Sequence, residues 1–290
     1  MESKLPNLFS HQDHYMQSFK EFSSQSAKFS VYAEWGDTVF SRVVLPSLRV
    51  RLSEQEELRV LGVGSGSGEM ECVMLGRLLQ QFPRINNRAV EPLQEQLVQY
   101  KQLAKSKADE LQGVYFDWRQ QTIEQYEKAG DATKFHLISS VHSLYDLDNP
   151  DSSLMYLYNR LEPGGVVLLV IISDESGFAR LWSPVAPFHN CFRYISSADV
   201  RNSLDRSGIP YTQHRHRRSV DITECFDETS EKGSLLLDFL VHVAKFKETA
   251  TEDLQRRVLE RLGSSECSEK SGDDVLLNAD CDTIVISKPL

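Results

Sequence analysis

Residues 58–71 constrain the fold of this chain more than any other stretch. An apolar run that ends at Val63 leads into Gly64, Gly66 and Gly68, and an acidic residue and a helical pattern follow. This order predicts a buried strand, a turn without side chains and the start of a helix. Because glycine has no Cβ, such a turn lets a ligand touch backbone amides at the helix N-terminus. The spacing matches the dinucleotide pattern G-x-G-x-x-G only loosely, since the third glycine comes one residue early.

Later segments indicate which kind of α/β sheet this turn belongs to. Arg88–Val90 is a second apolar segment that ends in Glu91, and a carboxylate at this place can accept hydrogen bonds from ribose hydroxyls. A further strand is expected over 135–141, and a helix that ends in Leu161–Gly165 precedes the apolar run Val166–Ile172. The order resembles the class I S-adenosylmethionine-dependent methyltransferases. A nicotinamide dehydrogenase would show the regular third glycine and a hydride-transfer constellation, and neither is found.

Composition and charge exclude several other classes. The chain has 290 residues, 40% hydrophobic and 26% charged, which suits one α/β domain with a modest insertion or cap. A net charge of −10 argues against a nucleic-acid partner, and the basic cluster at 214–218 is interpreted as solvated surface. The five cysteines lack C-x-x-C spacing, so neither a disulfide framework nor a metal site is expected. Without a signal core or a long apolar run, we expect a cytoplasmic protein with no membrane partner. The protein is also expected to be a monomer.

The remaining pattern predicts where helices, strands and loops lie. Besides the strands above, strands are expected over 113–118 and 281–287, and a loop over 263–274. Helices are expected over 5–30, 31–50, 70–82, 92–107, 151–161, 177–183, 196–206, 233–246 and 250–262. Alternating strands and helices favour a parallel sheet with right-handed crossovers. We therefore expect an α/β fold: a Rossmann-like class I methyltransferase sheet with helices on both faces and a smaller substrate-cap region.

These elements suggest a division into three parts. Residues 1–207 are expected to form the methyl-donor-binding domain with its N-terminal helices, and 208–275 the substrate cap. Residues 276–290 are expected to return to the core as a terminal strand. His136, inside a predicted strand, is interpreted as structural.

Short motifs spread over the chain resemble the histamine N-methyltransferase family. They are Leu8–Ser10, Tyr15, Ser18–Phe19, Phe22, Val90–Pro92, Glu95–Gln96, Leu144–Tyr145, Ser176–Gly177, Leu181–Trp182, Tyr194–Ile195, Asp221–Ile222, Cys225–Phe226 and Asp238–Leu240. The similarity runs from about residue 5 to 287. It implies an enzyme that transfers a methyl group from S-adenosylmethionine to an imidazole nitrogen of a small molecule.

The resemblance also implies two sets of site residues. The methyl donor is expected to lie against Gly64, Glu91, Gln96, Thr122, Ile123 and Val141. The acceptor is expected to contact Phe9, Tyr15, Phe19, Lys28, His142, Tyr145, Asp146, Phe178, Trp182, Phe188, Phe239 and either Ala279 or Asp280. Most of the second set are aromatic, which suits both a flat imidazole and a cationic sulfonium.

The expected reaction depends mainly on placement. A neutral imidazole has a free ring lone pair near neutral pH, because its unperturbed pKa is about 6.5. Holding it in line with the activated methyl group can contribute roughly 7–11 kcal/mol. We therefore expect positioning residues, with His142 and Tyr145 as candidates, and neither a catalytic triad nor a metal.

The expected acceptor contacts differ from the family pattern at several positions. Where the histamine enzymes carry glutamate, glutamine and tyrosine, this chain carries Lys28, His142 and Asp146. Their asparagine near the C-terminus corresponds here to Ala279 or Asp280. The donor positions are kept. The resemblance thus implies S-adenosylmethionine as the donor, while the changed residues decide the acceptor.

The changed charges favour carnosine, whose methylation gives anserine, as the acceptor. Lys28 would repel the amine of histamine but pair with a carboxylate, and Asp146 would pair with an amine. Alternatives stay open: Lys28 pointing to solvent, a histamine N-methyltransferase that binds the amine through other residues, or a non-catalytic donor-binding protein. His142 is either a partner of the acceptor's ring nitrogen or a packed strand-end residue.

Overall fold

Two compact units make up the protein, each assembled from separate stretches of chain. A computed structural model describes residues 5–26, 28–53, 55–146, 149–182 and 195–290, with the backbone alone for 28–30 and 146. The large-sheet unit comprises Phe29–Ile171, Asp199–His214 and Asp282–Leu290. The small-sheet unit comprises Met1–Lys28, Ile172–Ala198 and Arg215–Cys281.

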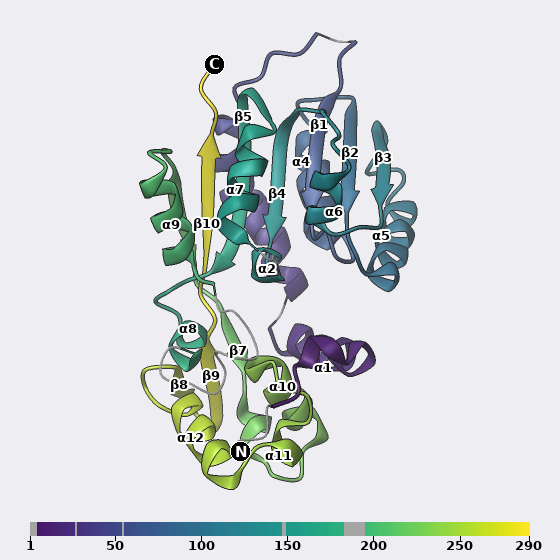
Figure 1. The fold of residues 1–290 in the computed structure, drawn as a ribbon. Helices are drawn as coiled ribbons and strands as arrows, with labels where there is room; N and C mark the ends of the chain where they lie inside the picture. Colours follow the sequence, from purple (N-terminus) through teal and green to yellow (C-terminus); the bar gives the residue numbers. More distant parts are fainter. Residues whose placement is uncertain (1–4, 27, 54, 147–148, 183–194) are drawn as a thin grey trace. The chain divides into compact units, whose positions relative to one another are not determined.

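A seven-stranded sheet of order β3-β2-β1-β4-β5-β10-β6 organises the large-sheet unit (Figure 1). The strands are β1 (Leu58–Val63), β2 (Ile85–Val90), β3 (Val114–Arg119), β4 (Phe135–Val141), β5 (Leu161–Ile172), β6 (Thr212–His216) and β10 (Cys281–Ser287). β1 runs parallel to β2 and β4, β2 to β3, and β4 to β5. The predicted α/β fold with a parallel sheet is confirmed.

The register of the central strands fixes where their carboxyl ends lie. Val63 at the end of β1 pairs with Val90 at the end of β2 and with Ser140 near the end of β4. β1 and β4 are almost wholly buried, which suits the largely apolar sequence of β1, because strands covered on both faces meet no water. The segments after β1, β2 and β4 therefore start from one edge of the sheet.

Helices cover both faces of this sheet, with α4 behind it and α6 and α7 in front in Figure 1. They are α2 (Lys28–Trp35), the π-helix η2 (Gly36–Val44), α3 (Leu45–Ser47), α4 (Glu69–Leu78), α5 (Gln94–Ser106), α6 (Ile123–Lys128), η3 (Leu144–Asp146), α7 (Pro150–Asn159) and α9 (Ser197–Arg206). α4 packs against α5 and η2, and α6 packs against α7. The helix predicted over 31–50 is thus three consecutive segments.

The predicted helix end at Leu161–Gly165 is wrong. α7 ends before this segment, and the Pro-Gly-Gly sequence lies inside the first part of β5. Leu161 pairs with Phe135, whereas Val166 pairs with Leu137, so the register shifts between these two positions of β4. The Pro-Gly-Gly segment therefore makes an irregular start to a strand, because it supplies more residues than β4 has opposite it.

The small-sheet unit contains an antiparallel sheet of order β7-β9-β8, flanked by helices. Its strands are β7 (Ser219–Asp221), β8 (Ser268–Ser271) and β9 (Asp274–Asn278). Its helices are η1 (Leu8–Ser10), α1 (Gln12–Gln25), α8 (Gly177–Trp182), η5 (Thr223–Phe226), α10 (Glu231–Val241), α11 (Phe246–Thr249) and α12 (Glu252–Leu262). α1 packs against α10, and α10 packs against η5.

The loop predicted over 263–274 is also wrong. This segment holds all of β8, which pairs with β9 as a hairpin from Ser268 opposite Leu277 to Ser271 opposite Asp274. Gly272 and the following aspartate form the connection, and a two-residue turn that contains glycine is a hairpin signal. The polar composition of β8, which is mostly exposed, concealed the strand.

The helix predicted over 233–246 ends earlier than expected. α10 stops at Val241 because His242 has a φ of 53°, and Lys245 has a φ of 52° before α11 begins. Both angles lie in the left-handed region, which a continuous helix does not contain. One predicted helix is therefore two helices joined by a tight bend.

Each unit groups stretches that lie far apart in the sequence. The first 28 residues group with Arg215–Cys281 in the small-sheet unit, and Asp199–His214 joins the large-sheet unit. The roles of donor domain and substrate cap remain a prediction.

Candidate functional site

In the glycine turn after β1, Gly64 and Gly68 are tightly packed against other residues, whereas Gly66 has free space beside it. Gly64, Gly66 and Gly68 have φ of 61°, 55° and 81°, which favour glycine. A Cβ at Gly64 would lie 2.3 Å from the Cβ of Ser143, and one at Gly68 would lie 2.0 Å from the Tyr100 ring. A Cβ at Gly66 would have one neighbour within 4 Å, a side-chain oxygen of α5 at 3.9 Å. The turn thus leaves room at Gly66 for a ligand to approach the backbone.

Glu91 is fixed beside this turn by two backbone amides. Its Oε2 accepts the N–H of Gly66 at 2.8 Å, and its Oε1 accepts the N–H of Leu93 at 2.9 Å. The N–H of Gly64 donates to the carbonyl oxygen of Val90 at 2.8 Å, so the turn is also tied to the end of β2. Burial raises the pKa of the Glu91 carboxyl above its usual range. The carboxylate is therefore oriented before any ligand arrives.

The other predicted donor residues follow the ends of neighbouring parallel strands. Gln96 is buried in α5, and Val141 ends β4. Thr122 caps α6, since its Oγ1 accepts the N–H of Gln125 at 3.2 Å, and Ile123 is the buried first residue of that helix. Ligands of open α/β sheets bind outside the carboxyl ends of such strands. The fold brings the predicted donor residues to that edge.

His142 follows β4 in a left-handed conformation with a φ of 52°. Its Nδ1 lies 3.2 Å from the hydroxyl oxygen of Tyr145, and the two rings are 18° from parallel. The neighbouring Ser143 donates its hydroxyl to the carbonyl oxygen of Val63 at 2.6 Å. A left-handed non-glycine residue costs of order 1–3 kcal/mol and occurs often at functional sites. The two positioning candidates are thus in contact.

Some predicted acceptor residues lie outside what the structure describes. Phe188 is not among the described residues, and the side chains of Lys28 in α2 and Asp146 in η3 are not described. Their expected contacts remain predictions.

An aromatic cluster joins η1, α1 and α10 in the small-sheet unit. Between ring centroids, Phe9 lies 5.0 Å from Tyr15, and Tyr15 lies 6.0 Å from Phe19. Phe239 lies 5.8 Å from Phe19 and 4.4 Å from Phe22. The spacing of the three α1 residues places them on one helix face, as the sequence predicts. Four predicted acceptor residues are thereby brought together.

His242 belongs to this cluster and was missed from the sequence. Its ring centroid lies 5.2 Å from that of Phe9, 5.6 Å from Phe239 and 5.3 Å from Trp182. Burial lowers the pKa of His242 to about 3, so the imidazole is neutral at neutral pH. Within a predicted continuous helix nothing distinguished this histidine, because its position depends on the left-handed bend that ends α10.

The remaining predicted acceptor residues are placed in the same unit. Phe178 is buried in α8, and Ala279 is buried after β9. The Oδ1 of Asp280 accepts the N–H of Arg218 at 2.9 Å, and the carbonyl oxygen of Asp280 accepts the N–H of Ser173 at 2.9 Å. Asp280 therefore connects three segments of the small-sheet unit.

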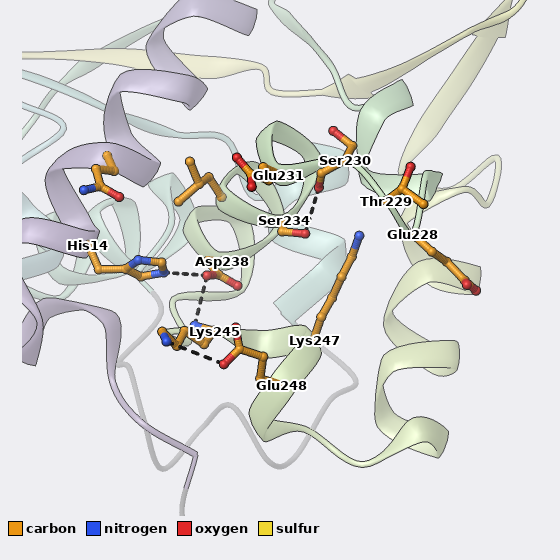
Figure 2. Close-up of a pocket in the computed structure, with 12 residues that line it drawn as sticks. His14, Glu228, Thr229, Ser230, Glu231, Ser234, Asp238, Lys245, Lys247 and Glu248 are labelled. Atoms are coloured by element: carbon orange, nitrogen blue, oxygen red, sulfur yellow. Dashed lines mark hydrogen bonds and ion pairs between the residues drawn. The ribbon is translucent and has the colours of Figure 1, made fainter.

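A hollow of about 410 Å³ lies beside α10, and Figure 2 shows the side chains around it. In its lining, His14 Nε2 lies 2.6 Å from Asp238 Oδ2 and so ties α1 to α10. Asp238 also accepts the N–H groups of Lys245 at 2.9 Å and Phe246 at 2.8 Å. Burial raises the pKa of the Asp238 carboxyl. These contacts hold the aromatic face of α1 next to Phe239.

Comparisons with known proteins agree with this geometry. A family model described as a methyltransferase domain matches residues 38–214. Histamine N-methyltransferase of Xenopus tropicalis is 31% identical and covers 99% of this chain and 100% of its own length. The enzyme of the same name from Mus musculus is 31% identical and covers 99% of each chain.

Solved structures show the same fold at low sequence identity. The plantazolicin methyltransferase BpumL in complex with SAH has a TM-score of 0.52 and 13% identity, covering 97% of this chain and 92% of its own. The YcgJ protein from Bacillus subtilis has a TM-score of 0.52 and 15% identity, covering 86% of this chain and 98% of its own.

The fold, the glycine turn and the match to the methyltransferase domain model together define this chain as a class I S-adenosylmethionine-dependent methyltransferase. The relatives narrow this class further, because they match at about one residue in three over almost the whole chain. The chain belongs to the histamine N-methyltransferase family and is an N-methyltransferase that uses S-adenosylmethionine.

The described residues contain neither a membrane-spanning helix nor a cluster of metal-binding side chains. No helix among them is both long and apolar enough to cross a membrane. Within the same residues, no group of three or more histidine, cysteine, aspartate or glutamate side chains could hold a metal ion.

Proposed function

We propose that this enzyme methylates a ring nitrogen of a small imidazole, with histamine as the better supported acceptor. The observation that carries the proposal is the similarity to histamine N-methyltransferases along nearly the full chain. It favours histamine over carnosine, the acceptor expected from the sequence. In this proposal the donor binds to the large-sheet unit, and the aromatic contacts to the acceptor come from the small-sheet unit.

The donor half of the proposal rests on the turn and Glu91. Each Glu91 oxygen accepts one backbone N–H and keeps a second lone pair, which suits the two hydroxyls of a ribose. The open side of Gly66 gives a ligand access to the backbone. Gln96, Thr122, Ile123 and Val141 would complete the contacts to S-adenosylmethionine.

The chemistry needs a flat, aligned and unprotonated imidazole. S-adenosylmethionine supplies a methyl group on a positively charged sulfur, so a C–N bond forms as the C–S bond breaks and the ring later releases a proton to solvent. The rings of Tyr15, Phe19 and Phe239 pack together, and the proposal is that a flat acceptor lies against this aromatic cluster. His142, oriented by its contact with Tyr145, is proposed to hydrogen-bond the acceptor.

Carnosine is the second candidate because of the residues at three positions. Lys28, His142 and Asp146 stand where the family pattern has glutamate, glutamine and tyrosine. A lysine suits the carboxylate of the dipeptide, and an aspartate suits its amine.

A methyl-transfer assay with histamine and carnosine side by side tests the proposal. With methyl-labelled S-adenosylmethionine we expect a labelled N-methylimidazole product and a kcat/KM at least about tenfold higher for histamine. The opposite preference would make carnosine the acceptor, and no labelled product from either would contradict the proposal. As a control, Lys28→Glu should change histamine turnover little but weaken carnosine if the dipeptide is the true acceptor.

The cellular context remains a prediction. A cytoplasmic location, a monomeric state and the absence of a nucleic-acid partner are expectations from the sequence.

A further inference from the structure

A buried carboxyl group lies beneath the glycine turn, outside the residues assigned to either substrate. Glu71, in the first turn of α4, is 5% exposed. Its Oε1 accepts the hydroxyl of Ser65 at 2.8 Å, and its Oε2 lies 3.5 Å from Asn87 Nδ2. The hydroxyl of Tyr100 also hydrogen-bonds this carboxyl. A charged side chain is rarely buried so fully unless partners require it.

The strand leading into the turn makes room for this carboxyl. A Cβ at Gly62 would lie 1.4 Å from Glu71 Oε1 and 2.7 Å from the hydroxyl oxygen of Ser65. The carboxyl therefore occupies the space that a side chain at position 62 would need. The absence of a side chain at Gly62 in β1 therefore leaves the space that the Glu71 carboxyl of α4 fills.

The side chains that most affect the pKa of Glu71 are hydrogen-bond partners and one other carboxylate. None of these described groups is a cation that could balance its charge. These groups are Tyr100, Ser65, Asn87 and the carboxylate of Glu91. Burial raises the pKa of Glu71 and also that of Tyr100. A salt bridge therefore does not explain the burial, whereas hydrogen bonding to the turn does.

Ser65 links Glu71 to the backbone of the glycine turn, where the donor is expected to bind. It lies between Gly64 and Gly66, and its carbonyl oxygen accepts the N–H of Gly68 at 3.1 Å. Its own N–H donates to the carbonyl oxygen of Val90 at 3.3 Å. Fixing Ser65 thus fixes the neighbouring Gly66 N–H, which in turn orients Glu91.

We propose that Glu71 is a positioning residue of the donor site, which holds the turn in its binding conformation through Ser65. It acts through the Ser65 hydroxyl, whereas Glu91 accepts the N–H of Gly66. The proposal goes beyond the choice of acceptor, because it concerns donor binding alone.

Binding of S-adenosylhomocysteine, measured by isothermal titration calorimetry, tests the proposal in the full chain. Ser65→Ala and Glu71→Leu should each weaken binding about tenfold, because each removes the hydrogen bond and leaves a buried partner unsatisfied. Glu71→Gln keeps the shape and a hydrogen-bonding oxygen, so it should bind within about threefold of the wild type. If Glu71 only filled space, Glu71→Leu would instead bind S-adenosylhomocysteine as well as the wild type.

A matched control is available two positions earlier in the same helix. Glu69→Ala removes a half-buried carboxyl that accepts the hydroxyl of Ser67, and it should leave binding within about twofold. Wild-type affinity in both Ser65→Ala and Glu71→Leu would overturn the proposal. Where Glu71→Leu fails to fold, Ser65→Ala decides, since it leaves the carboxyl in place. A wild type that binds the probe but methylates no imidazole would contradict the proposed function and leave this inference standing.

Discussion

At the scale of single residues, His136 links stability to pH. It lies in β4, and its Nδ1 accepts the N–H of Arg59 at 2.9 Å, which requires an unprotonated ring nitrogen. Burial, together with the positive charge of Arg59, lowers the pKa of His136 to about 4. The sequence predicted a structural role for this histidine, and the hydrogen bond between neighbouring strands is that role.

This residue makes the protein less stable in acid. An unfolded histidine binds a proton below about pH 6.5, whereas folded His136 stays neutral down to about pH 4. Between these values the unfolded chain binds more protons, so the free energy of unfolding falls as the pH falls. From pH 7 to pH 5 we expect a loss of about 2 kcal/mol from this group in urea unfolding. His136→Gln should lose correspondingly less over the same interval, and an unchanged pH dependence would refute the assignment.

At the scale of elements, apolar runs predicted the strands that position the site. β1, β4 and β5 carry near-continuous buried residues, so their existence and their carboxyl ends follow from sequence. The donor residues were assigned from the family resemblance, and in the structure they follow strand ends. The hairpin of β8 and β9 could not be recognised from composition, because Ser268–Ser271 is polar and mostly exposed.

The end of α10 is an element boundary with a functional consequence. His242 leaves the helix in a left-handed conformation and thereby enters the aromatic cluster. His242→Gly keeps the backbone conformation, because glycine tolerates this φ, but removes the ring between Phe9 and Trp182. We expect the KM for the imidazole acceptor to rise about tenfold while donor affinity stays unchanged.

Lys245→Gly is the matched control for this prediction. Lys245 shares the left-handed φ, at 52°, but its side chain is not part of the aromatic cluster in the described residues. It should leave both KM values within about twofold of the wild type. Equal effects of the two variants would mean that backbone strain, and not the imidazole ring, matters.

At the scale of the whole molecule, the chain assembles each unit from stretches far apart in sequence. His14 and Asp238, 224 positions apart, meet in the small-sheet unit. This contact could not be predicted from the sequence, because the local pattern near residue 14 does not indicate a partner 224 positions away. The aromatic residues of α1 were nevertheless predicted as a set, because a helical spacing is a local property.

Our proposal is that the methyl donor binds to the large-sheet unit and that the aromatic cluster of the small-sheet unit binds the acceptor. Steady-state kinetics of Glu91→Ala and Phe239→Ala, with both substrates varied, test it most directly. We expect Glu91→Ala to raise the KM for S-adenosylmethionine about tenfold or more and to leave the acceptor KM within about twofold. Phe239→Ala should do the reverse. If both variants raised the KM for the same substrate and spared the other, the assignment of donor and acceptor to separate units would be contradicted.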